Sequence, residues 1–184
     1  TVQKLTSDPI TRAAALFHDV AKARPGQRED GTFPFEGHEQ EGAERVRAMA
    51  RRWAWPQEFA ESVSSLVQWH RLPTAAWPAE GLTRRIRAYG EGWLERLFVL
   101  GYADVLAGTG RLMPWMENRA RALAASFRLE QAGRLLDGRE VMEILGLDEG
   151  PRVGELLEKL DEAVAEGEVA TPEEARAWLI RNSR

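Results

Sequence analysis

The sequence AAALFHDVAKARPGQREDGTFPFEGH, residues 13–38, decides how the rest of this chain is interpreted. It places His18 beside Asp19 near the end of an apolar helical pattern, and after a polar loop it reaches a second histidine, His38. The whole chain contains three histidines, so two of them lie in this one stretch. Side chains that can bind a metal ion are therefore concentrated here.

Two further side chains of this kind interrupt apolar helical patterns elsewhere. His70 follows Val63, Leu66 and Val67 at helical spacing, which places it on the core-facing stripe. Asp104 lies in the apolar segment WLERLFVLGYADVLAG, where an unpaired carboxylate would be costly to bury. We therefore expect a cation or strong hydrogen-bond donors beside it. These positions predict one metal site assembled from several helices.

The alternative is that each histidine is an ordinary core residue, which is the commoner case for a lone buried imidazole. The adjacent pair of His18 and Asp19 favours a metal, because consecutive residues at a helix end can both reach one cation. Mixed nitrogen and oxygen ligands suit Mn, Fe, Co, Ni or Zn better than Ca. Adding Asp104 gives three ligands and a position for water, which is the layout of a hydrolytic metal site.

Composition limits the class of protein. The chain has 184 residues, of which 43% are hydrophobic and 29% charged, as expected for a soluble globular protein with one core and at most a small appendage. The absence of cysteine excludes disulfides and thiol catalysis. No apolar run approaches the roughly 20 residues needed to span a bilayer, and no signal-peptide pattern is present. We therefore expect a cytoplasmic protein.

Charge is distributed unevenly along the chain. Residues 1–136 carry 19 basic and 16 acidic side chains, whereas residues 137–184 carry 6 and 13. The first part could meet an anionic substrate locally, but neither part has the clustered basic face of a general nucleic-acid binder. We interpret the arginines and glutamates of residues 38–54 as a solvated face, and the seven tryptophans as core and rim packing.

Nearly every segment has a helical pattern, and strand patterns are absent. Asp8-Pro9 is a start signal, and the helix that follows is apolar on both sides, so we expect it to be buried, His18 included. Trp53 is expected to point inward from the next helix. The expected helices are about 9–23, 38–54, 56–70, 82–88, 93–108, 114–132, 137–146, 151–167 and 172 onward. We predict an all-α fold with a helical body, residues 1–135, and a small helical appendage, residues 136–184.

The segments LFHDVAKA, FEGHEQEGAE, LVQWH and GYADVLAG, in this order, resemble the HD-domain metal-dependent phosphohydrolase superfamily. More narrowly, they resemble the HD domain that follows the nucleotidyltransferase domain in bacterial CCA-adding enzymes and related poly(A) polymerases. The tail, LLDGREVMEILGLDEGPRVGELLEKL and then GEVATPEEARAWL, is similar to the C-terminal helical segment of that family. The resemblance implies an HD-domain-like helical bundle with a C-terminal appendage.

The resemblance also implies roles for the metal-capable residues. His18 and Asp19 would form the doublet, with Asp19 catalytic as well, and Asp104 would be the closing ligand. His38 and His70 match positions that ligate a second metal or contact phosphate in related proteins. The implied cofactor is a divalent metal such as Mn, Ni, Co, Fe, Mg or Zn.

Two cations are candidates for contact with the substrate. Lys22 follows the doublet as it does in many family members and could lie near a phosphate oxygen, with a catalytic role. It could equally be a cation that stabilises the C-terminal end of a helix. Arg24 is a weaker candidate for substrate contact.

The implied function is metal-dependent hydrolysis of nucleotide or RNA-end phosphates, either phosphomonoesters or 2′,3′-cyclic phosphodiesters. The alternative is a non-catalytic scaffold or a module that binds tRNA or another RNA and works with a separately encoded nucleotidyltransferase. No paired-carboxylate nucleotidyltransferase domain precedes the doublet, so nucleotide addition by these residues alone is not expected. The superfamily usually supplies another histidine upstream of the doublet, and residues 1–17 contain none, which favours the alternative.

Overall fold

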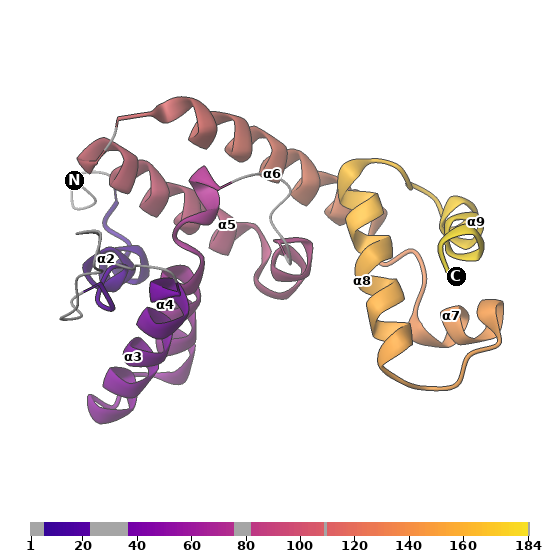
Figure 1. Cartoon of the computed structure of the whole chain (residues 1–184), viewed down its shortest axis with the longest axis horizontal. Coiled ribbons are helices and arrows are strands. Elements are labelled where there is room, and N and C mark those ends of the chain that lie inside the picture. Colours follow the sequence, from indigo (N-terminus) through magenta and orange to yellow (C-terminus); the bar gives the residue numbers. More distant parts are fainter. Residues whose placement is uncertain (1–5, 23–36, 76–81, 109, 184) are drawn as a thin grey trace, which may run out of the picture. The chain divides into compact units, whose positions relative to one another are not determined.

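The computed structural model describes residues 6–22, 37–75, 82–108 and 110–183, and within them all regular structure is helical (Figure 1). The all-α prediction is therefore confirmed. The chain divides into two compact units, one of residues 1–77 and 92–119 and one of residues 78–91 and 120–184. The boundary after residue 135 stays a prediction. Among the described helices, none has the length and apolar character needed to cross a membrane.

The first unit contains α2, α3, α4, the short 3₁₀ helix η1, and parts of α5 and α6. Their bounds are α2 Pro9–Phe17, α3 His38–Arg52, α4 Gln57–Trp69, η1 Leu72–Thr74, α5 Leu82–Ala107 and α6 Leu112–Ala132. Asp8 caps α2 as predicted, because its carboxylate accepts the backbone N–H of Thr11 at 2.8 Å. Both α2 and α3 pack against α4.

Three predictions about this part of the chain are wrong. Helix α2 ends at Phe17, earlier than expected, and His18 is its C-terminal cap. The helix is not buried on both sides, because Ala14 is fully buried while Leu16 is 75% exposed. These residues lie about 200° apart around the helix, so one packs inward when the other faces solvent. Trp53, expected to point inward, is 52% exposed because it follows the last helical residue of α3 and leaves the helical periodicity.

The end of α3 forms a Schellman turn. The backbone N–H of Trp55 donates to Ala50 O at 2.9 Å, and that of Ala54 points to Arg51 O at 3.4 Å. Ala54 has φ +50°, in the left-handed region that glycine usually occupies at this position. This turn places the indoles of Trp53 and Trp55 side by side, with ring centroids 5.7 Å apart.

The two helices expected over residues 82–88 and 93–108 both lie within the span of α5, and the break expected between them is the non-helical backbone at Gly90. Gly90 lies at the kink with φ +73°, a conformation that glycine adopts without steric cost. Pro73 approaches α5 closely at Gly101, because a Cβ there would lie 2.6 Å from Cβ and Cγ of Pro73. The carbonyl of Pro73 in turn accepts from Asn118 Nδ2 at 3.3 Å.

The second unit contains α7, Gly138–Leu145, α8, Pro151–Glu166, and α9, Pro172–Asn182. Asp137 caps α7 and Thr171 caps α9, and both are reciprocal capping boxes. The side chains of Leu136, Leu156 and Leu179 are at most 1% exposed and belong to its core. The guanidinium of Arg87 donates to Leu129 O, Gly133 O and Asp161 Oδ1 at 3.0, 2.6 and 2.8 Å, which satisfies the carbonyls at the end of α6.

Candidate metal centre

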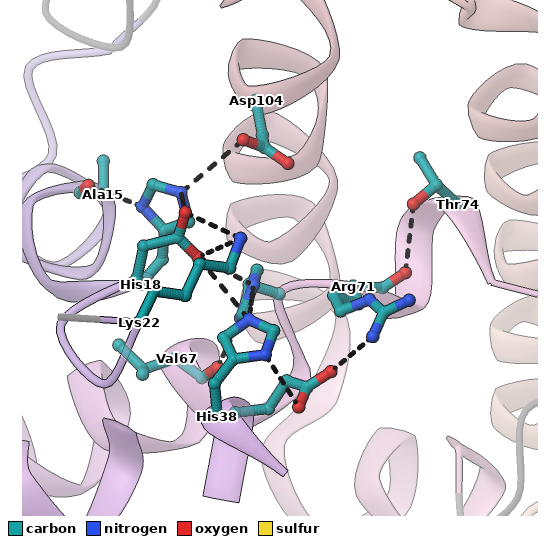
Figure 2. Close-up of polar contacts among 11 residues, drawn as sticks. Ala15, His18, Lys22, His38, Val67, Arg71, Thr74 and Asp104 are labelled. Carbon is teal, nitrogen blue, oxygen red and sulfur yellow. Dashed lines mark hydrogen bonds and ion pairs between the residues drawn. The ribbon is translucent and has the colours of Figure 1, made fainter. Parts of the chain in front are cut away.

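The candidate ligands lie at helix ends in the first unit, together with one residue within α5. His18 and Asp19 directly follow α2, His38 is the first residue of α3, and His70 caps the end of α4. Asp104 comes from α5. Figure 2 shows His18 and His38 directed into one region, with Asp104 facing His18. Helix ends suit a shared site, since side chains at the termini of several helices can converge on one point.

Asp19 is the central residue of this cluster. Its Oδ1 lies 3.5 Å from Nε2 of His38 and 3.7 Å from Nε2 of His70. Its Oδ2 lies 3.5 Å from Nε2 of His18. The Nε2 atoms of His38 and His70 are themselves 3.3 Å apart. All three imidazoles of the chain therefore present Nε2 to a single carboxylate.

Asp104 completes the cluster from a different environment than expected. Its Oδ1 lies 3.5 Å from Nε2 of His18, but its side chain is 53% exposed. The prediction that this carboxylate would be buried in the core is wrong. It lies on the solvent side of His18, whose side chain is 22% exposed, so it does not carry the full desolvation cost.

Hydrogen bonds of the Nδ1 atoms explain why the imidazoles of His18 and His70 direct Nε2 toward Asp19. Nδ1 of His18 lies 2.8 Å from Ala15 O, and Nδ1 of His70 lies 2.7 Å from Val67 O. A carbonyl can only accept, so both Nδ1 atoms carry the proton and donate. In a neutral ring Nε2 then carries the lone pair, which is the atom that a metal ion would bind.

In His38 the Nδ1 atom lies beside a carboxylate, where Nδ1 of His18 and of His70 lies beside a backbone carbonyl. Its Nδ1 lies 3.3 Å from Oε2 of Glu39, and Oε1 of Glu39 is 3.0 Å from Nη1 of Arg71 (Figure 2). Burial tends to raise the pKa of Glu39, but its own backbone N–H, Arg71 and His38 outweigh this and lower it. Glu39 is thus ionised and held against His38.

Charge within the cluster differs from one imidazole to another. The hydrogen bond to Asp104 is the largest cause that raises the pKa of His18, against the opposing effect of burial. The same hydrogen bond lowers the pKa of Asp104. Burial lowers the pKa of His70, which favours its neutral form. The cluster thus combines a buried imidazole, whose neutral form is favoured, with a half-buried imidazole that pairs with an exposed carboxylate.

These residues fit a divalent cation. Oδ1 of Asp19 is a buried oxygen that accepts no hydrogen bond of good geometry in the described part of the chain. Asp19, His38 and His70 each offer a ligand atom, and these atoms lie within 4.8 Å of one another. Two neutral imidazoles whose lone pairs face each other at 3.3 Å repel unless a cation or a proton lies between them. Nitrogen and oxygen donors together suit a transition metal.

Lys22 is the cation closest to Asp19 among the described side chains. Its Nζ lies 2.8 Å from each of the two carboxylate oxygens, and it donates a hydrogen bond to Oδ2. The ammonium of Lys22 therefore offsets part of the negative charge on Asp19. The contact with Asp19 agrees with the predicted place of Lys22 at the site, and its role there, like the alternative role as a helix-end cation, stays a prediction.

The structure thus brings together the five residues predicted as metal ligands, and Lys22 lies beside them. Arg24 lies outside the described residues, so its predicted contact stays a prediction. Sequence reasoning missed Glu39 and Arg71. Glu39 directly follows His38 in the quoted segment FEGHEQ, so its position was a usable signal, but Arg71 is distant in sequence and gave none.

Comparison with known families matches residues 5–109 to the HD domain, which is more than half of the chain and includes all five candidate ligands. The chain therefore belongs to the HD domain family. Among curated proteins it is 41% identical over 179 residues to a CC-adding tRNA nucleotidyltransferase of Thermus thermophilus, covering 92% of this chain and 39% of that protein. It is also 38% identical over 184 residues to an A-adding tRNA nucleotidyltransferase of Deinococcus radiodurans, covering 95% and 42%.

The chain spans about two fifths of the length of these curated relatives. The resemblance noted from the sequence is confirmed at the level of the family and of these relatives. No solved structure matches significantly.

Proposed function

We propose that this chain is a divalent-metal-dependent phosphohydrolase that acts in the cytoplasm on nucleotide or RNA-end phosphates, either phosphomonoesters or 2′,3′-cyclic phosphodiesters. The observation that carries the proposal is the convergence of three imidazole Nε2 atoms on Asp19, with Asp104 beside His18. A carboxylate with buried imidazoles has little use as packing, but it is a good set of metal ligands. The two tRNA-modifying relatives support RNA as the substrate class.

The two oxygens of Asp19 face different partners, which supports two metal-binding sets that share this residue. Oδ2 faces His18, which pairs with Asp104, and Oδ1 faces His38 and His70. We assign the first set to one metal ion. The second set, which is more deeply buried, holds a second ion or, with no ion there, contacts the substrate phosphate.

A bound divalent cation would polarise a phosphoryl oxygen and lower the pKa of water near it. The contributions of the chain itself follow from its contacts. Asp19 supplies the anionic charge at the centre, and the Nδ1 hydrogen bonds of His18 and His70 keep their rings from turning. Lys22, already beside Asp19, carries a mobile ammonium that can move to a phosphate oxygen, and Arg24 is a second candidate for that contact.

The test of the site is Asp19→Ala. We expect loss of metal-dependent phosphate release, because both proposed sets lose their shared ligand, while circular dichroism still reports a helical protein. Glu44→Ala, an exposed position on α3, is the matched control and should retain activity. Metal content of the purified protein and a screen of linear and cyclic nucleotide phosphates complete the experiment. Equal activity of Asp19→Ala and the original protein would contradict the proposal.

One specific observation favours a second candidate function. Nearly the whole of this chain matches about two fifths of each of two tRNA nucleotidyltransferases. On that proposal the chain is a non-catalytic scaffold or RNA-binding module that positions tRNA for a separately encoded nucleotidyltransferase. It predicts RNA binding without phosphate release from any nucleotide, whatever metal is supplied. The same substrate screen therefore separates the two candidates.

A further inference from the structure

The region around the end of α3 carries a feature that the metal site does not use. A cavity of about 430 Å³ lies between the C-terminal part of α3 and the first turns of α4. Arg47, Arg51 and Trp55 line it, together with Glu61 on the α4 side. Its volume is in the range of sites that hold small organic ligands.

An exposed aromatic cluster adjoins this cavity through Trp55. The ring of Trp55 lies 5.7 Å from Trp53 and 6.1 Å from Phe17, measured between centroids. Trp53 is 52% exposed, and Leu16 beside Phe17 is 75% exposed. Phe17 directly precedes His18, so the cluster extends from the cavity to a residue adjacent to the candidate metal centre. We call the cavity and this cluster together the Trp53–Trp55 surface.

The arginines near this surface differ from those nearer the start of α3. Arg45 is engaged, since it contacts Glu41 at 2.8 Å and Val20 O at 3.1 Å. Arg51 and Arg52 are exposed, and neither side chain makes a hydrogen bond or ion pair with any described residue. The expectation of a solvated face with helical ion pairs thus describes the first turns of α3 and not its last turn.

We propose that the Trp53–Trp55 surface binds a single-stranded segment of RNA, with a base stacked on the exposed indole of Trp53 and its phosphates near Arg51 and Arg47. An exposed aromatic ring beside arginines that carry no ion pair is a combination that binds single strands, because stacking is tolerant of sequence and the backbone is anionic. Arg47 donates only to the amide oxygen of Gln68, at 3.4 Å. The carboxylate of Glu61, which accepts from Gln57 Nε2 at 2.8 Å, is placed to accept a base amino group as well.

This inference rests on the proposed function and narrows its substrate class from any nucleotide phosphate to the end of an RNA strand. A mononucleotide at the metal centre would not reach the cavity, because Arg51 lies 13 residues from His38 along α3, about 20 Å at the helical rise. A strand of several nucleotides spans that distance.

The test measures binding of a fluorescent oligocytidylate of about 12 nucleotides to the 184-residue chain by anisotropy, at several salt concentrations and with chelator present. The chelator removes the divalent metal, so RNA binding is measured without the proposed hydrolysis. Hydrolysis is assayed separately on a mononucleotide. Trp53→Ala removes an exposed ring, so the fold should survive, and we expect the Kd to rise about tenfold. Arg51→Gln should reduce the slope of log affinity against log salt by about 0.7, as expected when one phosphate contact is lost.

Two variants outside the surface serve as controls. Phe127→Ala removes another large exposed aromatic ring, 62% exposed on α6, and Arg119→Gln removes another exposed arginine. Both should bind RNA as the original chain does. The proposal is overturned if the original chain shows no binding up to about 100 μM RNA, or if Trp53→Ala and Arg51→Gln match the controls. A change of oligomeric state in Trp53→Ala with unaltered RNA affinity would identify a protein interface and also overturn it.

Discussion

At the scale of single residues, the candidate site depends on how each imidazole is oriented. Two of the three histidines donate Nδ1–H to a carbonyl three residues earlier, at Ala15 and Val67. This local contact selects the Nε2 lone pair for the site before any ligand is present. Nδ1 of His38, the first residue of α3, lies 3.3 Å from Oε2 of Glu39. The same orientation is thus reached by two different means.

Substitution of Glu39 tests this difference. Glu39→Gln keeps the size of the side chain but removes the charge that holds the His38 ring, so we expect metal affinity to fall about tenfold, as for other outer-shell partners. Titration calorimetry with Mn²⁺ or Zn²⁺ measures it. Glu44→Gln on the same helix is the control, and it should bind metal with unchanged affinity. An equal affinity of Glu39→Gln and the control would show that the contact does not position the ring.

At the scale of elements, helix ends organise the molecule. Asp8, Asp137 and Thr171 begin helices with side-chain caps. Gly146 and Gly167 follow helices in the left-handed conformation. These signals act over three or four residues, so they could be predicted from sequence. The end of α2 could not, because His18 to Ala21 still have helical composition and the chain turns there to bring Asp19 toward His38 and His70.

The turn after α3 provides a prediction at this scale. Ala54 adopts φ +50° where glycine would be unstrained, so Ala54→Gly should raise the free energy of unfolding. Relief of the left-handed strain exceeds the added freedom of the unfolded chain, and the net gain is about 0.5–1 kcal/mol. Urea denaturation followed by circular dichroism measures it. Ala48→Gly, within the same helix, should instead lower stability by about 1 kcal/mol, and a loss in both variants would contradict the interpretation.

At the scale of the whole molecule, contacts between helices distant in sequence hold the first unit together. Nε of Arg96 on α5 lies 3.2 Å from Oδ2 of Asp8 before α2. Nε1 of Trp93 donates to Oγ of Ser65 on α4 at 3.0 Å. Both contacts place the helices that carry His18, His70 and Asp104, so the candidate site is a product of the fold of this unit.

Acid should weaken this unit in part through Asp8. Burial tends to raise the pKa of Asp8, but hydrogen bonds from Thr11 and contact with Arg96 lower it below its ordinary value of 3.8. A lowered pKa in the folded state gives stability that is present above pH 3.8 and is lost as pH falls through the folded pKa.

Asp8→Asn keeps the helix cap but cannot ionise, so it should be less stable than the original chain near neutral pH and more nearly equal to it at low pH. Urea denaturation at pH 7 and near pH 3, with Asp137→Asn as a capping control in the other unit, measures the difference. A stability gap that is independent of pH would contradict the assignment.

Much of this protein follows from its sequence alone. The helices, their capping residues and the identities of the five candidate ligands could be read from local patterns, because helix formation and capping depend on residues three or four apart. Family resemblance then connected the ligand types with metal-dependent chemistry. None of these inferences required the distance between two helices.

Only the tertiary structure decided which groups face each other. The two oxygens of Asp19 are shared between His18 on one side and His38 and His70 on the other. The exposure of Asp104, Leu16 and Trp53 likewise depends on which neighbours cover them. The physical reason is that burial and convergence arise from packing between helices far apart in sequence, for which a local apolar pattern is only an indirect guide.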